Sequence, residues 1–315
     1  MPAVRFARFA WAFLAYNALV IVWGAYVRAS GSGAGCGSHW PTCNGEVIHR
    51  PRSIETVIEM SHRLTSGLAL IGSVVLAVWA FRAFPKGHQA RRAGGAQLGF
   101  MLAEALVGAA LVLFEHVAHN PSAKRGLSMS LHLVNTFFLL ASLVLTAHLG
   151  GGGRPIRLKN QGVIAWPLAI SALAMLLVGT SGAIAALGDT LFPARSLGDG
   201  LAQDLAAGSH VFLRLRALHP LFAVTVGALV VGTATLARAA RPGDAEVSRA
   251  SKLLAALYFV QLGIGLANVG LLAPIPLQLV HLVMADAVWV MLVLLGANVM
   301  ATRDTSEIAP VPARA

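Results

Sequence analysis

The stretch LHLVNTFFLLASLVL, residues 131–145, is mostly apolar and carries a single histidine near its start. A transmembrane helix needs about 20 predominantly apolar residues, and this run is long enough once its flanks are included. Seven other segments resemble it in length and character. We therefore predict an all-α membrane protein with eight transmembrane helices. Their expected ranges are 9–27, 57–81, 97–114, 127–147, 163–187, 212–237, 253–272 and 277–300.

Composition supports a membrane protein and argues against nucleic-acid binding. Hydrophobic residues make up 57% of the chain and charged residues 12%, about half the share of charge in a soluble domain. The net charge of +11 comes from basic residues in alternate connections, as in cytoplasmic loops. We expect both termini in the cytoplasm, a bacterial plasma membrane as location and no nucleic-acid partner. The basic residues on that side are Arg5, Arg8, Arg82, Lys86, Arg91, Arg92, Arg154, Arg157, Lys159, Arg238, Arg241, Arg249, Lys252, Arg303 and Arg314.

Both cysteines lie in one glycine-rich connection, GAGCGSHWPTCNGE, residues 33–46. This connection is expected on the outer, oxidising side of the membrane, where a disulfide between Cys36 and Cys43 can persist. Two unpaired thiols are the alternative. A zinc site fits less well, because two cysteines and His39 fall short of four ligands.

The two halves of the chain resemble each other. The stretch 131–145 has a counterpart in VHLVMADAVWVMLVLL, residues 280–295, and residues 59–78 have one in residues 215–232. A shared Gln-Leu-Gly pairs residues 97–99 with 261–263, and Gly24 is paired with Gly179. We predict two pseudo-symmetric four-helix bundles, residues 1–149 and 163–315, joined by a cytoplasmic linker over residues 150–162. Repeats with an even number of helices are parallel.

Four histidines occupy equivalent positions near the outer ends of the second, fourth, sixth and eighth predicted helices: His62, His132, His219 and His281. Ionisable residues inside a membrane are costly and usually functional. Two imidazoles at one depth on two helices of a bundle can hold a haem iron from both faces. Zinc would need more ligands close together. We therefore predict two haem sites, His62 with His132 and His219 with His281.

The residue three positions before the first histidine of each half differs between the halves. Glu59 shares a helix face with His62 and can handle protons, or it serves only as a carboxylate that the helix dipole favours. Arg216, before His219, can pair with a haem propionate through a bidentate fork. We therefore expect the reaction in the N-terminal half and a permanent cofactor in the C-terminal half.

The sequence does not assign a single role to several other polar residues. Glu104 and Asp286 lie within predicted helices, and each serves either a proton path or an interhelix hydrogen bond. No role is assigned to the outer-loop residues His39, His116 and His119.

These features together resemble the haem A synthase family, in its cysteine-containing bacterial subgroup. The resemblance rests on eight helices in two halves, the four histidines, Glu59-Met-Ser-His62 and the pair Cys36-x6-Cys43. It implies haem b at His219 and His281, substrate haem O at His62 and His132, and a catalytic role for Glu59. It also implies a Cys36–Cys43 disulfide, with either a structural or a redox role.

The reaction implied by the resemblance is hydroxylation of the C8 methyl of haem O, followed by further oxidation and loss of water to the formyl group of haem A. Such a product would serve terminal oxidases. A dihaem cytochrome b that transfers electrons is the alternative function, and a transporter with repeated halves is a third. Expected partners are haem O synthase, the cytochrome oxidase assembly machinery, the lipid bilayer and an unidentified electron donor, with a homo-oligomer as a further option.

Overall fold

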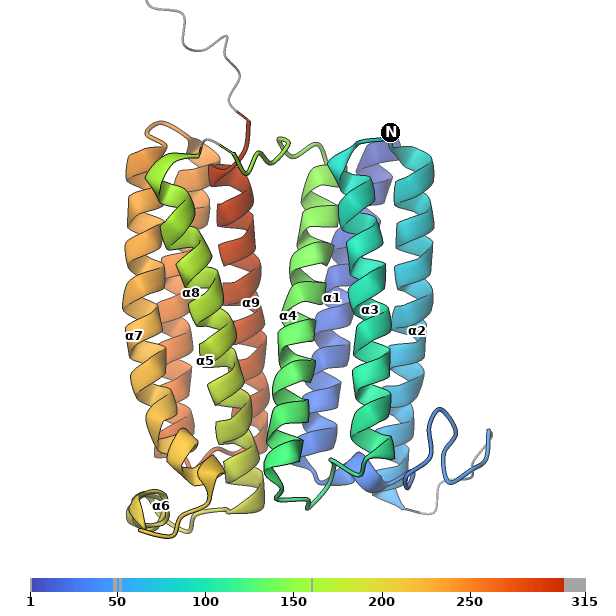
Figure 1. The fold of residues 1–315 in the computed structure, drawn as a ribbon, viewed down its shortest axis with the longest axis vertical. Coiled ribbons are helices and arrows are strands. Elements are labelled where there is room, and N and C mark those ends of the chain that lie inside the picture. The colour runs from blue at the N-terminus through green and yellow to red at the C-terminus, as the bar shows by residue number, and fades with distance from the viewer. Residues whose placement is uncertain (1, 48–49, 51–52, 160, 303–315) are drawn as a thin grey trace, which may run out of the picture.

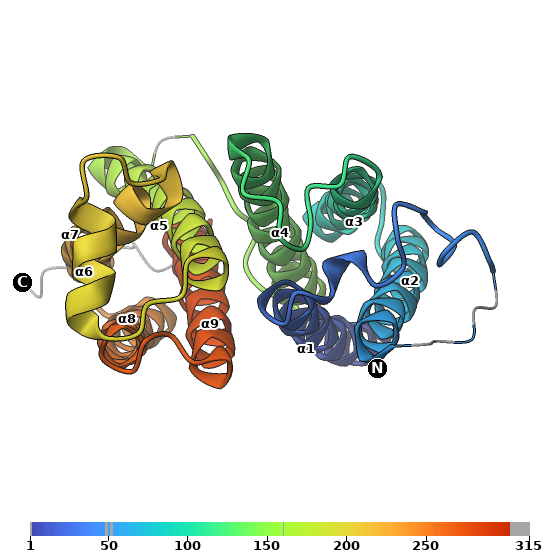
Figure 2. The same ribbon diagram turned by 90° about the horizontal axis from the view of Figure 1, so that it is seen from below.

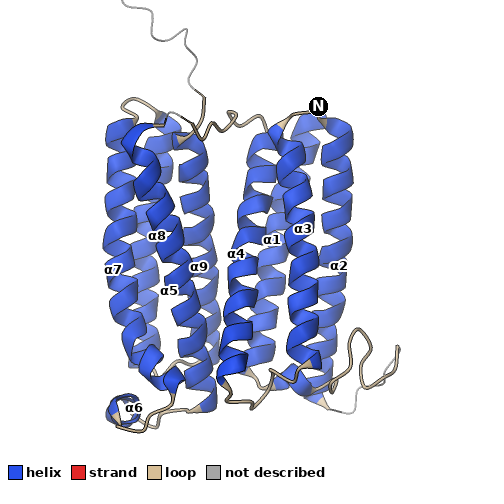
Figure 3. Ribbon diagram, in the orientation of Figure 1, coloured by secondary structure: helices blue, strands red, loops and turns tan. Residues whose placement is uncertain are grey.

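The computed structural model describes residues 2–47, 50, 53–159 and 161–302. Helices connected by loops make up this part of the chain (Figure 3). Eight of the helices are long and apolar enough to cross a membrane, which confirms the predicted all-α membrane fold. Arg303 and Arg314, predicted in the cytoplasmic tail, lie outside the described residues. The helices are α1 (Pro2–Ala29), α2 (Ile54–Ala83), α3 (Gln89–Leu113), α4 (Ala123–Gly150), α5 (Ala165–Leu191), α6 (Leu197–Leu205), α7 (Val211–Ala240), α8 (Ala245–Gly270) and α9 (Ile275–Val299).

The membrane-length helices stand in two neighbouring groups. Figures 1 and 2 show α1 to α4 on one side and α5, α7, α8 and α9 on the other. The groups meet where α4 packs against α5 and α9, and where α1 packs against α9. The connection with both cysteines and the short helix α6 lie at the same end of the molecule, which we call the disulfide end (Figure 1).

The helix starts follow from local sequence. Ser53 accepts a hydrogen bond from the amide of Thr56 at the start of α2, and Ser122 does the same for Arg125 at the start of α4. Asp244 accepts from two amides at the start of α8. These side chains satisfy amide groups that have no partner within the helix. Each cap therefore fixes where a span begins.

The helix α4 lies at the centre of the molecule. It packs against α1 and α3 of its own group and against α5 and α9 of the other group. It is the most buried of the eight candidate spans. Leu139, Leu140, Leu143, Val144 and Ala147 are almost fully buried. These positions recur every three or four residues, the spacing of one helix face. The apolar stretch of residues 131–145 thus provides buried packing surface for a helix that contacts α1, α3, α5 and α9.

An aromatic pair joins the two groups. The Phe137 ring on α4 stacks on the Trp289 ring on α9, with ring centres 5.1 Å apart and planes 14° from parallel. The indole Nε1 of Trp289 also donates to the Phe137 carbonyl oxygen at 2.7 Å. Both residues are at least 97% buried. Stacking and an interhelix hydrogen bond therefore act at one contact.

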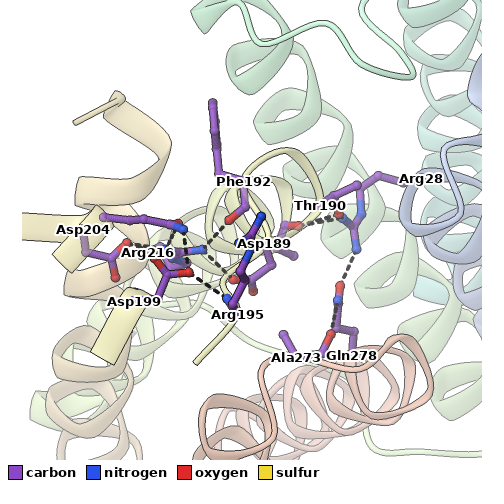
Figure 4. Close-up of polar contacts among 12 residues, drawn as sticks. Arg28, Asp189, Thr190, Phe192, Arg195, Asp199, Asp204, Arg216, Ala273 and Gln278 are labelled. Atoms are coloured by element: carbon purple, nitrogen blue, oxygen red, sulfur yellow. Dashed lines mark hydrogen bonds and ion pairs between the residues drawn. The ribbon is translucent and has the colours of Figure 1, made fainter. Parts of the chain in front are cut away.

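A second contact between the groups lies nearer the disulfide end. Arg28 on α1 donates to the carbonyl oxygen of Ala186 and the hydroxyl of Thr190, both on α5. It also donates to the side-chain oxygen of Gln278 on α9 at 2.9 Å (Figure 4). One guanidinium thereby ties three helices together.

The connection between α5 and α7 differs from expectation. The sequence predicts no helix between the spans 163–187 and 212–237, whereas Leu197–Leu205 forms the helix α6, capped by Ser196. The helix has nine residues and none of them is buried. It is therefore too short to be predicted as a membrane-spanning segment.

Trp289→Phe keeps an aromatic ring beside Phe137 but removes the indole donor. We expect the free energy of unfolding to fall by about 0.6–1.7 kcal/mol, the range for interhelix hydrogen bonds in membranes. Trp289→Ala also leaves a cavity and should cost about 3–5 kcal/mol. Unfolding in mixed detergent micelles, followed by circular dichroism, measures both values. The matched control is Trp166→Phe, at a position 71% exposed; equal effects of the two phenylalanine variants would contradict the assignment.

Candidate functional site

The four predicted ligand histidines lie at a similar depth. His62 lies on α2, His132 on α4, His219 on α7 and His281 on α9. All four helices begin at the disulfide end, and each histidine lies within the first three turns of its helix. The structure therefore brings one pair to the disulfide end of each group of helices.

The pair on α7 and α9 has the separation of two imidazoles that share one metal ion. The ring centres of His219 and His281 lie 6.5 Å apart, with the rings perpendicular at 87°. Two metal–imidazole bonds of about 2 Å, plus about 1 Å from each nitrogen to its ring centre, would separate the centres by roughly 6 Å. The separation of the two ring centres is thus the one that a single iron between two histidines requires.

The pair on α2 and α4 has unsatisfied ring nitrogens. His62 is the ninth residue of α2 and His132 the tenth residue of α4, so the two lie at a similar distance from the start of their helices. The Nδ1 atom of each ring is buried without a hydrogen-bond partner, as is Nδ1 of His281. Buried polar atoms without partners are uncommon and costly. Each of these Nδ1 atoms can therefore take one further hydrogen-bond partner.

Three of the four histidines pack against a glycine on a neighbouring helix. A Cβ atom there would lie 2.8 Å from the His62 ring at Gly24, 3.0 Å from the His219 ring at Gly182, and 3.1 Å from the His281 ring at Gly265. Any larger side chain would push the imidazole away. The predicted pairing of Gly24 with Gly179 is therefore wrong, because Gly182 is the residue that faces a histidine, whereas Gly179 faces Phe137.

The structure also corrects which residues of α3 and α8 are equivalent in the two halves. Gln97 bonds to Ser73, away from the histidines. Gln261 instead lies 3.3 Å from Nε2 of His281, and the residue of α3 that approaches a histidine is Glu104, 3.5 Å from Nδ1 of His132. Glu104 therefore corresponds to Gln261, and the predicted pairing of residues 97–99 with 261–263 has the wrong register.

Glu59 is held by the cysteine loop. Its side chain is 97% buried, and Oε2 accepts a hydrogen bond from the backbone amide of Cys36 at 2.8 Å. Oε1 accepts from Nε of Arg63 at 3.2 Å. Arg63 in turn donates to the carbonyl oxygens of His39 and Thr42. The carboxylate thus lies one turn closer to the disulfide end than His62, under a loop that both charged groups hold in place.

The predicted disulfide between Cys36 and Cys43 is formed, and both cysteines are buried. No free cysteine is found among the described residues. The described residues also include no group of three or more His, Cys, Asp or Glu side chains arranged for a metal ion. A haem does not need such a group, because the macrocycle supplies the other ligands of its iron.

The guanidinium of Arg216 already forms hydrogen bonds with carboxylate and carbonyl oxygens. Its guanidinium donates to Asp204 on α6, to Asp189 at the end of α5 and to the carbonyl oxygen of Phe192 (Figure 4). The arginine therefore fixes α6 against α7. Its contact with a propionate remains a prediction, and a propionate would have to compete with two carboxylates.

The remaining polar residues have distinct surroundings. Asp286 on α9 is 96% buried, and neither carboxyl oxygen has a hydrogen-bond partner. His116 shares a hydrogen bond with Ser128 at 2.8 Å, and the His119 ring packs near Gly31. No hydrogen bond or ion pair joins any of these three described side chains to the four ligand candidates.

This fold and this site define a multi-pass helical membrane protein with a histidine pair in each half. The model of the COX15-CtaA family, described as a cytochrome oxidase assembly protein, matches residues 7–293. The chain belongs to this family, and the resemblance found in the sequence is confirmed.

Individual relatives match to different extents. A protein of Thermus thermophilus named protoheme IX farnesyltransferase is 51% identical over 296 residues, which are 94% of this chain and 48% of the relative. The chain thus spans about half the length of that relative. Proteins named heme A synthase from Lysinibacillus sphaericus and Alkalihalophilus pseudofirmus are each 41% identical over 96 residues, which are 30% of this chain. These stretches cover 31% and 32% of the two relatives.

Arg63→Ala should loosen the cysteine loop, because it removes the donors to the His39 and Thr42 carbonyl oxygens. We expect faster proteolytic cleavage within residues 37–46 while the disulfide remains intact. Limited proteolysis, followed by mass spectrometry with and without reduction, measures this. Arg214→Ala, on α7, is the control. Unchanged cleavage in Arg63→Ala would show that the disulfide alone holds the loop.

Proposed function

We propose that this protein is a haem A synthase, which oxidises the C8 methyl of haem O to a formyl group and so provides haem A for terminal oxidases. The observation that carries the proposal is the perpendicular His219–His281 pair with ring centres 6.5 Å apart. Its counterpart on α2 and α4, in a chain of this family, suggests a second porphyrin site.

The two histidine pairs receive different roles. His219 and His281 hold haem b, and His62 and His132 hold the substrate haem O. When bound, the haem iron supplies the redox chemistry, while the protein positions and orients the reacting groups. Ser181 Oγ lies 2.9 Å from Nδ1 of His219 and fixes the orientation of that ring, as partners of metal-bound imidazoles commonly do.

Glu59 is proposed to handle protons at the substrate site. Its Oε1 and Oε2 atoms lie on the disulfide side of His62, already oriented by Arg63 and the Cys36 amide. A carboxylate held in this way can accept or return a proton without having to reorganise. The same contacts make the disulfide a structural tether for the Glu59 carboxylate.

The proposal includes a location and partners. We propose two bundles, residues 1–149 for substrate and 163–315 for haem b, in a bacterial plasma membrane with the disulfide end outside and the termini in the cytoplasm. The basic connections favour this orientation. The relative of which this chain spans about half is named protoheme IX farnesyltransferase, which supports haem O synthase as a neighbour in the pathway. Cytochrome oxidase assembly proteins and an electron donor complete the proposed partners.

Pigment analysis of the purified protein tests the function. Haem O or haem A beside haem b is expected. Two equivalents of haem b alone, without conversion of added haem O, would favour the electron-transfer alternative. Absence of any haem from a folded preparation would contradict both.

His219→Ala should remove haem b and leave the fold intact, because one of the two proposed iron ligands is lost. The absorption spectrum after reduction measures haem b, and circular dichroism checks the fold. His148→Ala, near the opposite end of α4, is the control and should keep its haem. A full haem b signal in His219→Ala would rule out the assignment of the cofactor half.

Glu59→Gln should lower the conversion of haem O to haem A by about 10²–10⁴-fold, the usual contribution of a positioned acid or base, while haem stays bound. Product analysis by chromatography measures the conversion. Arg63→Ala separates proton handling from loop docking, because it loosens the loop but keeps the carboxylate. An equal loss in both variants would reduce Glu59 to a docking role.

A further inference from the structure

A carboxylate lies next to the predicted ligand His132, whereas its counterpart His281 has no carboxylate at the equivalent position. Glu104 on α3 approaches Nδ1 of His132 on α4 at 3.5 Å. The equivalent residue in the other half, Gln261 on α8, lies 3.3 Å from the other ring nitrogen, Nε2, of His281. The two halves therefore place an acid and a neutral amide at matching positions beside a predicted iron ligand.

Neighbouring side chains fix the Glu104 carboxylate. Asn135 donates from Nδ2 to Oε2, and its Nδ2 also donates to the Phe100 carbonyl oxygen at 2.9 Å. Thr136 donates its hydroxyl to Oε1 and lies 2.9 Å from the His132 carbonyl oxygen. Asn135 and Thr136 follow His132 within about one turn of α4. The carboxylate is thus oriented by the same helix that carries the histidine.

The carboxylate retains acceptor capacity for the imidazole. An ionised carboxylate offers about four acceptor positions, and Asn135 and Thr136 use one on each oxygen. Nδ1 of His132 has no hydrogen-bond partner, although Oε1 is only 3.5 Å away. A small rotation of the ring would let Nδ1–H donate to Glu104 and leave Nε2 free on the opposite side.

We propose that Glu104 is a positioning residue that binds Nδ1–H of His132, so that Nε2 faces the iron of the haem in the N-terminal half and donates electron density to it more strongly than His281 does. The proposal rests on the proposed function. A carboxylate that accepts the second N–H of a metal-bound histidine fixes the ring and makes it a stronger ligand. A nearby negative charge also favours the more positive iron. Gln261 brings no charge, and its contact is with Nε2 of His281 rather than with Nδ1.

Exchanging the two residue types tests the proposal. The full chain with His219→Ala carries haem only in the N-terminal half, and it is loaded with haem O. Glu104→Gln in this chain should bind haem O within a few-fold of the parent but raise the reduction potential of the bound haem. Glu104→Leu should weaken haem binding by about 10–100-fold. Spectroscopic titration and potentiometry measure the two quantities.

The reciprocal change provides the control. Gln261→Glu, in a chain with His132→Ala, should lower the reduction potential of haem b in the other half. An unchanged potential in Glu104→Gln would overturn the proposal, even if Glu104→Leu failed to fold. A parent chain that takes up no haem O in the N-terminal half would instead overturn the proposed function, and the inference with it. A merely structural role for Glu104 would move the thermal stability but not the potential.

Discussion

The structure depends on the cost of placing imidazole rings inside a membrane. Each of four helices carries one histidine at a similar depth, and three of these rings have a buried nitrogen without a partner. Membranes offer no water to satisfy such atoms. Glycines on neighbouring helices keep space around three of the rings. A metal centre shared by the two rings of each pair, as proposed above, would explain why these costly side chains lie at one depth.

The two histidine pairs have different surroundings. On the disulfide side of the first histidine, Glu59 binds Arg63 and a loop closed by a disulfide, whereas Arg216 binds two aspartates and the helix α6. Glu104 lies next to His132 in one half, and Gln261 lies next to His281 in the other. Direct contacts through Arg28, Phe137 and Trp289 hold these two environments against each other.

Features set by residue type along one helix could be predicted from the sequence. The eight apolar runs, the four histidines and the Cys36–Cys43 pair belong to this class. Features set by contacts between helices could not. The short Gln-Leu-Gly repeat suggested a register that the contact of Gln261 with His281 corrects. The helix α6 places Leu197, Leu201 and Leu205 four residues apart, but its nine residues are too few for a membrane span. The carboxylate partners of Arg216 come from α6 and the end of α5, and sequence spacing does not reveal such contacts between elements.

The central claim is that an iron lies between the two histidines of each half. Anomalous X-ray scattering at the iron edge, from crystals of the haem-loaded protein, tests it most directly. Two peaks per chain are expected, one between His219 and His281 and one between His62 and His132. Iron bound elsewhere, or rings of one pair turned away from a common peak, would contradict it.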